Sequence, residues 1–282
     1  MTGKLIYTAG LSVLFFALLS FYKDSKTELN AKNIEQNLAK ISDDLYASKC
    51  EVSNGEYQLF LSELKNEDPL QAGKYKVDST KWLSGGAYQQ PMANYYHLHP
   101  AYKNYPVVCV SYEAALAYCD WLSNKYNSES KRKFSKVKFY LPSEEEWTMV
   151  ANGGNKNKMY PWAAFYLRNN KGEFLCNFKH VGDQFISYNA EKKEYFIIPE
   201  ARVGSLNDGA MYTSPVKSFP EVEPYGLYNV SGNVAEMVNE KGIAKGGSYN
   251  STGYDVRISS RMTYTESSPE IGFRVFMKVL EK

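Results

Sequence analysis

Glycine and proline interrupt this chain at short intervals between Gly153 and Gly272, and this feature limits the fold more than any other. These residues break helices and strands, so long regular elements are not expected there. Disorder is not expected either, because 44% of the residues are hydrophobic and 15% are aromatic. The chain therefore predicts a packed domain made largely of ordered loops. Bound cations are candidates for holding such loops together.

The size and charge of the chain exclude some classes of protein. Its 282 residues suit one large domain or two small ones. The formal net charge is +2, no basic block occurs, and zinc-finger spacing is absent, so no nucleic-acid partner is expected. The 24 tyrosines indicate either an aromatic ligand surface or a tyrosine-rich core.

Four cysteines, at positions 50, 109, 119 and 176, include no Cys-x-x-Cys pair, which argues against a cysteine-rich zinc site. One or two disulfides in an oxidising compartment, or buried free thiols, both remain open.

An uncharged apolar run extends from Leu5 to Tyr22 and is just long enough to span a bilayer. We predict an uncleaved signal-anchor over residues 1–24; a cleaved signal peptide is the alternative. In either case the rest of the chain leaves the cytoplasm. The expected location is the cytoplasmic (inner) membrane, single-pass, with the domain facing the periplasm or exterior. Cleavage would instead release it into the periplasm.

Residues 25–48 have apolar side chains at spacings of three to five, which predicts an amphipathic helix acting as a stalk or packing on the main domain. Three further helices are expected over 56–64, 111–126 and 143–150. Ser111 and Ser143 are the expected N-caps of the last two, and Glu146 sits at a capping-box position. A short strand is expected over 272–279.

Several blocks, in order, resemble the formylglycine-generating-enzyme (sulfatase-modifying factor) family. They are EVSNGEYQLF from Glu51, YPVVCVSYEAALAYCDW from Tyr105, LPSEEEW from Leu141, YPWA from Tyr160, SPVKSFP from Ser214, YGLYNVSGNVAE from Tyr225, KGGSY from Lys245 and GFR from Gly272. The resemblance implies one domain over residues 49–282. Its fold class is α+β with sparse secondary structure, related to C-type lectins, here with an N-terminal transmembrane helix.

The resemblance also implies a catalytic site that this chain lacks. Enzymes of that family oxidise a substrate cysteine with a copper ion held by two cysteines, because soft thiolates suit Cu(I). The corresponding positions are Ser251 and Val256. Ser248 matches the family's active-site serine. We therefore expect no copper and a pseudoenzyme with a vestigial cleft at these three residues.

Calcium is the cofactor that the resemblance retains, in two structural sites. The first would use the side chains of Asn177 and Asp208 with the carbonyls of Phe178 and Ala210. The second would use the side chains of Asn229 and Glu236 with the carbonyls of Gly232 and Val234. Calcium prefers such oxygen ligands; the alternative is that the asparagines and aspartate only stabilise turns.

Histidines offer a weaker metal candidate. His97 and His99 would face one side of a strand, but their segment resembles an ordered loop and lacks an acidic third ligand. Unpaired loop histidines, including His180, are the favoured interpretation.

The functional expectation is a non-catalytic, membrane-anchored cell-envelope protein that binds protein partners in a complex. The spelling HPAY from His99 followed by YPVV from Tyr105 resembles a branch found in gliding-motility and type IX secretion lipoproteins. An enzyme with another active site in the same cleft and a lectin-like glycan-binding module are the alternatives.

Overall fold

A computed structural model describes residues 28–85, 89–181, 186–197 and 210–282. The helices are α2 (Ala31–Gln36), α3 (Asn54–Glu67), α4 (Pro69–Lys74), α5 (Gln90–Tyr95), α6 (Tyr112–Ser128) and α7 (Glu144–Asn152), with 3-10 turns η1 (Ser79–Gly85) and η2 (Pro100–Tyr102). The strands are β1 (Leu38–Lys40), β2 (Leu45–Ser48), β3 (Lys136–Tyr140), β4 (Ile186–Asn189), β5 (Glu194–Ile197), β6 (Ala235–Met237), β7 (Ile243–Lys245), β8 (Met262–Thr263), β9 (Ile271–Gly272) and β10 (Phe276–Glu281).

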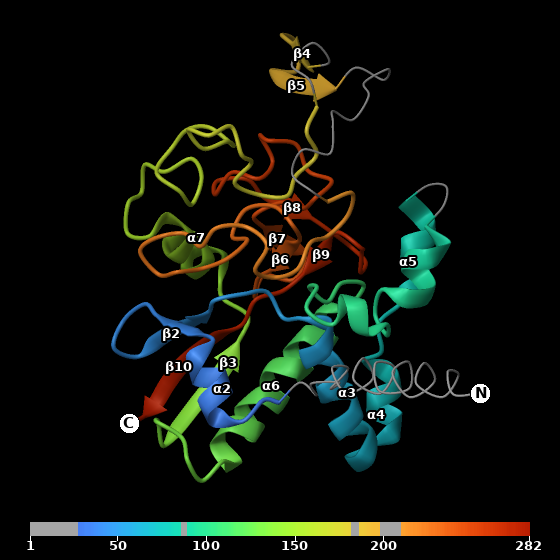
Figure 1. Ribbon diagram of the computed structural model, residues 1–282, viewed down its shortest axis with the longest axis vertical. Helices are drawn as coiled ribbons and strands as arrows, with labels where there is room; N and C mark the ends of the chain where they lie inside the picture. Colours follow the sequence, from blue (N-terminus) through green and yellow to red (C-terminus); the bar gives the residue numbers. More distant parts are fainter. Residues whose placement is uncertain (1–27, 86–88, 182–185, 198–209) are drawn as a thin grey trace, which may run out of the picture.

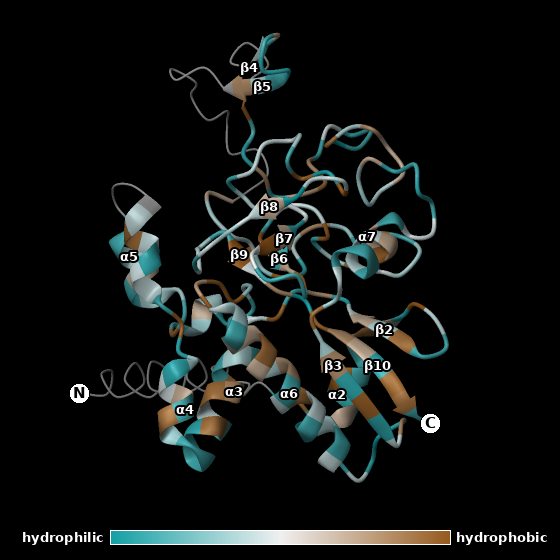
Figure 2. Cartoon of the chain, turned by 180° about the vertical axis from the view of Figure 1, so that it is seen from behind, coloured by the Kyte–Doolittle hydropathy of each residue, from teal (hydrophilic) through white to brown (hydrophobic). Residues whose placement is uncertain are grey.

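The larger core lies between α6 and an antiparallel sheet of strand order β1-β2-β10-β3 (Figure 1). Buried and exposed residues alternate along β3, as expected for a strand with one buried face, whereas β10 begins with two buried residues, Phe276 and Met277 (Figure 2). Tyr118 and Tyr126 of α6 are fully buried in the cluster that also holds Phe139 of β3. Helix α6 therefore packs against the buried face of this sheet.

The three helices predicted within the main domain are confirmed. Ser111 caps α6, and both α3 and α7 begin with a complete capping box, formed by Ser53 with Glu56 and by Ser143 with Glu146. The C-terminal strand is divided: β9 and β10 belong to different sheets. The mixed α and β content agrees with the predicted class.

The single helix predicted over residues 25–48 is wrong for the described part of that segment. Only Ala31–Gln36 is helical, and the chain then forms β1, a turn and β2. The turn at Ser42, Asp43 and Asp44 explains the difference, because the Ser42 hydroxyl bonds the Asp44 carboxylate at 2.8 Å and the amide of Ile41 bonds the Leu45 carbonyl at 2.9 Å.

This N-terminal segment is part of the domain and not a separate stalk. Strand β2 pairs with both β1 and β10, and Ile34 of α2 is buried in the large core. The sheet order thus places residues from before position 49 inside the main fold.

A second sheet has the order β8-β7-β6-β9, in which β6 and β9 run parallel (Figure 1). Helix α7 packs near it, and the buried Trp147 donates its indole N–H to Glu236 of β6 at 2.7 Å. Loops surround these short strands, as the glycine and proline pattern predicts. Of the predicted site residues, Glu236 lies in this sheet, and Gly232, Val234 and Ser248 lie in the loops next to β6 and β7.

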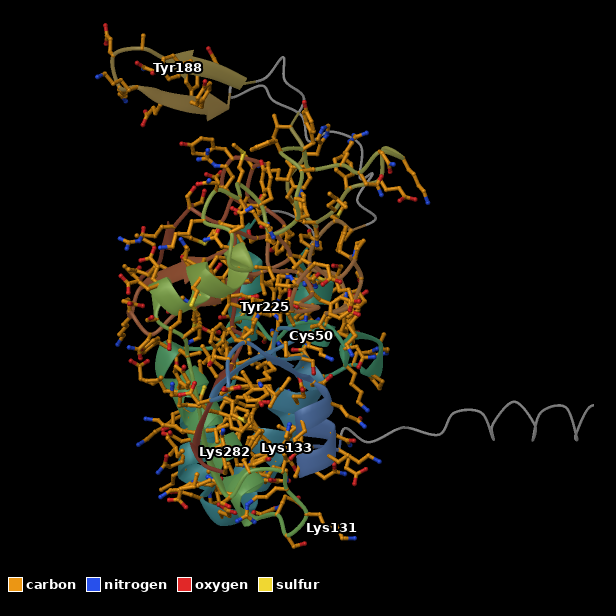
Figure 3. All side chains as sticks on the ribbon, turned by 90° about the vertical axis from the view of Figure 1, so that its left-hand side faces the viewer. Cys50, Lys131, Lys133, Tyr188, Tyr225 and Lys282 are labelled. Carbon is orange, nitrogen blue, oxygen red and sulfur yellow. The ribbon has the colours of Figure 1, made fainter. Side chains whose placement is uncertain are left out.

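Strands β4 and β5 form a two-stranded hairpin at one end of the molecule. Figure 3 shows Tyr188 on this hairpin, far from Lys131, Lys133 and Lys282 at the other end. Both of its strands pair only with each other among the described residues.

The state of the cysteines and the presence of a membrane-spanning helix can be stated for the described residues. Cys50, Cys109 and Cys119 are free thiols there, all four cysteines are buried, and burial raises the pKa of Cys50 to about 12. No helix in the described part of the chain has the length and apolar character needed to cross a bilayer. The predicted signal-anchor over residues 1–24 lies outside that part.

Candidate functional site

Ser248 follows a turn that only glycine suits. Gly246 and Gly247 have φ angles of 85° and 69°, and a Cβ on Gly247 would lie 2.9 Å from the Asp255 carbonyl oxygen. The turn buries Ser248 completely, and its hydroxyl donates to Glu270 at 2.9 Å. The serine hydroxyl is thus held by a carboxylate.

Ser251 is held within the same turn. Its oxygen accepts the backbone N–H of Ser248 at 2.9 Å and lies 3.3 Å from the Ser248 hydroxyl oxygen. A hydroxyl engaged in this way stabilises the turn and is a poor ligand for a soft metal ion.

Val256 has no exposed surface. It packs in an apolar cluster with Tyr160, Phe174, Cys176 and Phe178. This side chain offers no ligand atom, and its surroundings suit a hydrocarbon group. The three residues of the predicted vestigial cleft are therefore close in the chain and buried, but they hold no pair of soft ligands.

A buried polar network joins the loops beside this turn. Glu51 is fully buried and accepts hydrogen bonds from Asn233 at 2.8 Å and from Asn229 at 3.2 Å. Burial raises the pKa of the Glu51 carboxyl to about 8. Asn233 also accepts from Ser214, so the network connects three distant segments.

Asn177 extends this network. Its amide donates to the Tyr212 carbonyl at 2.7 Å and its backbone carbonyl accepts from Asn233 at 2.8 Å. Gly232 makes this approach feasible, since a Cβ there would lie 2.2 Å from the Asn177 carbonyl oxygen. Both Asn229 and Asn233 adopt left-handed backbone angles, which asparagine tolerates better than most residues.

Glu236 makes a buried ion pair with Arg274. Arg274 donates to it from Nε at 3.0 Å and from Nη2 at 2.6 Å, and it also donates to the carbonyls of Ser48 and Tyr228. With the Trp147 indole, three N–H donors satisfy this carboxylate. Arg274 thereby connects the end of β2, the loop before β6 and β6 itself.

Two oxygen atoms in this region fit a cation. The side-chain oxygens of Asn177 and Asn229 are buried and have no hydrogen-bond partner among the described residues. Each is the first ligand of one predicted calcium group, and unpaired buried oxygens are costly unless an ion or water satisfies them.

The remaining predicted calcium ligands differ between the two groups. In the first group, Phe178 and Ala210 are described and Asp208 lies outside the described residues. In the second, Gly232 and Val234 flank the turn beside Asn229, whereas Glu236 is engaged by Arg274 and Trp147. The carboxylate that contacts Asn229 directly is Glu51.

The histidines do not form a metal pair. His97 is buried, and its Nε2 accepts the indole N–H of Trp82 at 3.3 Å while Nδ1 lies 3.3 Å from the Asn54 side-chain oxygen. Burial lowers the pKa of His97 to about 4. His99 is exposed and accepts from the Ala101 amide. Within the described ranges, no three His, Cys, Asp or Glu side chains gather as a metal site.

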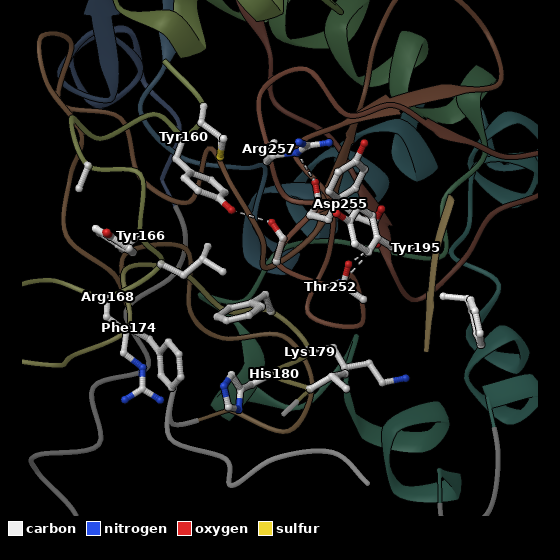
Figure 4. A pocket seen from close by; sticks show the side chains of 18 of the residues that line it. Tyr160, Tyr166, Arg168, Phe174, Lys179, His180, Tyr195, Thr252, Asp255 and Arg257 are labelled. Atoms are coloured by element: carbon white, nitrogen blue, oxygen red, sulfur yellow. Dashed lines mark hydrogen bonds between the residues drawn. The ribbon is translucent and has the colours of Figure 1, made fainter. Parts of the chain in front are cut away.

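A cleft of about 1570 Å³ opens beside Val256, between the β4–β5 hairpin and the loops at 159–181 and 252–257. Figure 4 shows Arg168 and Phe174 on one side of it and Tyr195 and Thr252 on the other. Its wall carries four basic residues, Arg168, Lys179, Lys193 and Arg257, and two acidic ones, Glu194 and Asp255.

The fold and these motifs have known relatives. The model of the sulfatase-modifying factor enzyme 1-like domain matches residues 21–279. The chain belongs to this family. Two solved structures share the fold: CarF, with 19% identity, a TM-score of 0.50 and coverage of 83% of this chain and 86% of its own; and PvdO from Pseudomonas aeruginosa, with 21% identity, a TM-score of 0.52 and coverage of 83% and 80%.

Curated relatives match over a shorter range. The inactive C-alpha-formylglycine-generating enzyme 2 of Bos taurus is 29% identical over 185 residues, which are 60% of this chain and 49% of the relative. The formylglycine-generating enzyme of Mus musculus is 30% identical over 197 residues, covering 61% and 44%. The chain thus spans about half the length of the curated relatives it matches.

Sequence reasoning missed two parts of this site. Glu51 begins one of the family-like blocks, but nothing in its spacing indicates that it is buried between two asparagines. The hairpin over 186–197 falls in a stretch without a clear pattern, although Tyr195 and Phe196 are the kind of residues that favour strands.

Proposed function

We propose that this family member is non-catalytic and acts by binding partners. The observation that carries the proposal is the position of Val256, which is fully buried among aromatic side chains. The resemblance to the family's enzymes places a copper-binding cysteine at this position. Ser251, at the other such position, is committed to the Ser248 turn. Neither residue supplies the thiolate that Cu(I) chemistry requires.

The relatives' names support this assignment only in part. They include inactive formylglycine-generating enzymes and others named as formylglycine-generating enzymes. The proposal that this chain is non-catalytic therefore depends on the residues present at positions 251 and 256.

The test is a direct assay. Purified full-length protein is incubated with copper and a Cys-x-Pro-x-Arg peptide, and the peptide mass is followed. We expect no conversion of the cysteine to formylglycine and no stoichiometric copper. The variant carrying both Ser251→Cys and Val256→Cys is the matched control for copper binding, since it restores two thiols. Formylglycine formation by the native chain would refute the proposal.

We also propose that the apolar run at Leu5–Tyr22 holds the domain at the cell envelope, in the cytoplasmic membrane with the domain outside the cytoplasm. Release into the periplasm after cleavage is the alternative. The resemblance of the HPAY and YPVV segments supports a structural role in an envelope complex related to gliding motility or type IX secretion.

Structural calcium is the third part of the proposal. The orphan oxygens of Asn177 and Asn229 support it. The first group, Asn177, Phe178, Asp208 and Ala210, offers a set of oxygen ligands that calcium prefers. In the second, Asn229, Gly232, Val234 and Glu236, the Glu236 carboxylate is already bonded to Arg274. Bound calcium would fix the loops between the two sheets.

A further inference from the structure

The β4–β5 hairpin forms one wall of the cleft and has unpaired edges. Its register pairs Ser187 with Phe196, Tyr188 with Tyr195 and Asn189 with Glu194, and neither strand has another partner among the described residues. A two-stranded hairpin is only marginally stable alone. Its free edges present N–H and C=O groups that can accept an added strand. Three residues of β5, Glu194, Tyr195 and Phe196, line the cleft, whereas β4 contributes Tyr188, so β5 is the strand along which a ligand would lie.

Aromatic rings extend from the hairpin onto the body of the domain. Tyr188 and Tyr195 have ring centroids 4.9 Å apart, and Tyr195 lies 6.3 Å from Tyr254. The three residues are 50%, 65% and 57% exposed, although tyrosine rings gain stability from burial. All three rings line the cleft and form a surface that a ligand could cover.

The charges of the cleft are unbalanced. Arg168 and Arg257 stack on Phe174 and Tyr254, which fixes their guanidinium groups at the wall. Neither these two nor Lys179 and Lys193 form an ion pair with any carboxylate in the described ranges. Of the two acids in the lining, Asp255 accepts a hydrogen bond from the Thr252 hydroxyl at 2.6 Å. The carboxylate of Glu194 lies 4.0 Å from the ammonium group of Lys192, a residue that does not line the cleft. The cleft therefore favours a negatively charged ligand.

We propose that this cleft binds an extended, acidic segment of a partner polypeptide, which pairs with the free edge of β5. The proposal deepens the partner-binding function stated above and rests on it. In an extended segment, side chains alternate between two faces. One face would lie on the Tyr195 and Tyr254 rings, and acidic side chains would reach Arg168, Lys179 or Arg257.

An acidic glycan is the competing ligand, because sugars also stack on tyrosine and pair with arginine. The strand edge favours the polypeptide. The edge offers a row of backbone N–H and C=O groups at the spacing of another β-strand. A polypeptide can pair with this row, whereas a glycan would use only the side chains.

The test uses full-length protein in detergent, immobilised and exposed to a phage-displayed library of random nine-residue peptides. In parallel, the same protein is exposed to an array of acidic oligosaccharides that includes oligogalacturonates. We expect the library to enrich peptides with several Asp or Glu residues alternating with apolar ones. Enrichment of basic peptides, or of none, would overturn the proposal. So would binding of an acidic oligosaccharide without any enriched peptide.

The best enriched peptide is then synthesised and its affinity measured by fluorescence polarisation. Arg168→Glu should weaken binding at least tenfold, whereas Lys171→Glu, an exposed neighbour that does not line the cleft, should change it less than threefold. Proline at each position of the peptide in turn should cost at least tenfold at alternate positions, because it removes the N–H that a strand partner needs. Equal tolerance of proline at every position would exclude strand addition.

Tyr195→Thr removes the central ring and keeps a residue that favours strands. We expect it to weaken the peptide at least fivefold. Arg168 lies outside the hairpin, so the Arg168→Glu result stays informative if the hairpin variant misfolds. Formylglycine production would refute the proposed function without bearing on this cleft, and failure of acidic peptides to bind would refute the cleft alone.

Discussion

Single polar residues at the centre of this fold are held by buried hydrogen bonds and ion pairs. The Ser248 hydroxyl is bonded to Glu270, and Glu236 to Arg274 and Trp147. Removing one partner of a buried ion pair leaves an uncompensated charge, which typically costs about 3–5 kcal/mol. We therefore expect a substitution of Glu236 or Arg274 alone to destabilise the domain.

His97 provides a residue whose protonation should control stability. Its Nε2 accepts from Trp82, so Nδ1 carries the hydrogen and faces Asn54. A second proton would place N–H against N–H, and burial already lowers the pKa to about 4 from 6.5. The unfolded chain takes up that proton first as the pH falls. The stabilisation is thus complete above pH 6.5 and is lost between about pH 6.5 and 4.

We expect the free energy of unfolding to fall by about 2–3 kcal/mol over that range because of His97, given about 1.4 kcal/mol per pKa unit. Urea titrations at several pH values measure it. His97→Gln should reduce the slope, since glutamine can accept from Trp82 and donate to Asn54 without titrating. His99→Gln, at an exposed site, should leave the slope unchanged; a slope that His97→Gln does not alter would contradict the assignment.

At the level of elements, helices with clear caps could be predicted and strands with distant partners could not. Ser111 and the capping box at Ser143 are local signals, and α6 and α7 begin where they indicate. Strand β2 depends instead on β10, more than 200 positions later in the chain. Its Leu45 fits a helical spacing with Ile41 equally well, so only the turn at Asp43–Asp44 separates the two interpretations.

In the candidate site, too, local motifs could be predicted and contacts between distant strands could not. The asparagines at 177 and 229 could be proposed as calcium ligands from their motifs, and this stays a prediction. Their side-chain oxygens are buried and have no hydrogen-bond partner within the described ranges. The pairing of Glu236 with Arg274 could not, because it depends on the sheet that brings β6 beside the segment after β9.

The N-terminal elements give a prediction about truncation. Removal of residues 1–24 should leave a folded domain with a melting temperature within about 2 °C of the full chain and should release it from membranes. Removal of residues 1–48 should abolish the cooperative transition, because it deletes α2, β1 and β2 and exposes the edge of β10.

Circular dichroism melting and membrane fractionation test both truncations. A cooperative, equally stable product lacking residues 1–48 would contradict the fold described here. A mature full chain that begins after about residue 20 and appears in the soluble periplasmic fraction would contradict the anchor.

At the scale of the whole molecule, loops rather than long elements fill the region between the two sheets. Their stability should therefore depend on bound calcium. A ligand that binds only the folded state contributes about 2.7 kcal/mol at one hundred times its dissociation constant. For a domain of this size, that corresponds to a rise in melting temperature of about 5–10 °C.

Chelation should lower the melting temperature by this amount and added calcium should restore it. Asp208→Ala or Asn229→Ala should reduce the response, whereas Asn157→Ala, in an exposed turn, should not. Differential scanning calorimetry with metal analysis measures both quantities. A native protein that contains no calcium and melts identically in chelator would rule out the structural role.

The position of β10 in its sheet has a consequence for how the protein is made. This strand lies between β2 and β3, yet its residues 276–281 are synthesised more than 130 positions after β3. The sheet cannot assemble until they emerge from the ribosome, and contacts this distant also slow folding. Until β10 is made, the nascent chain can pair β2 only with β1, and β3 lacks the strand beside which it lies in the folded sheet.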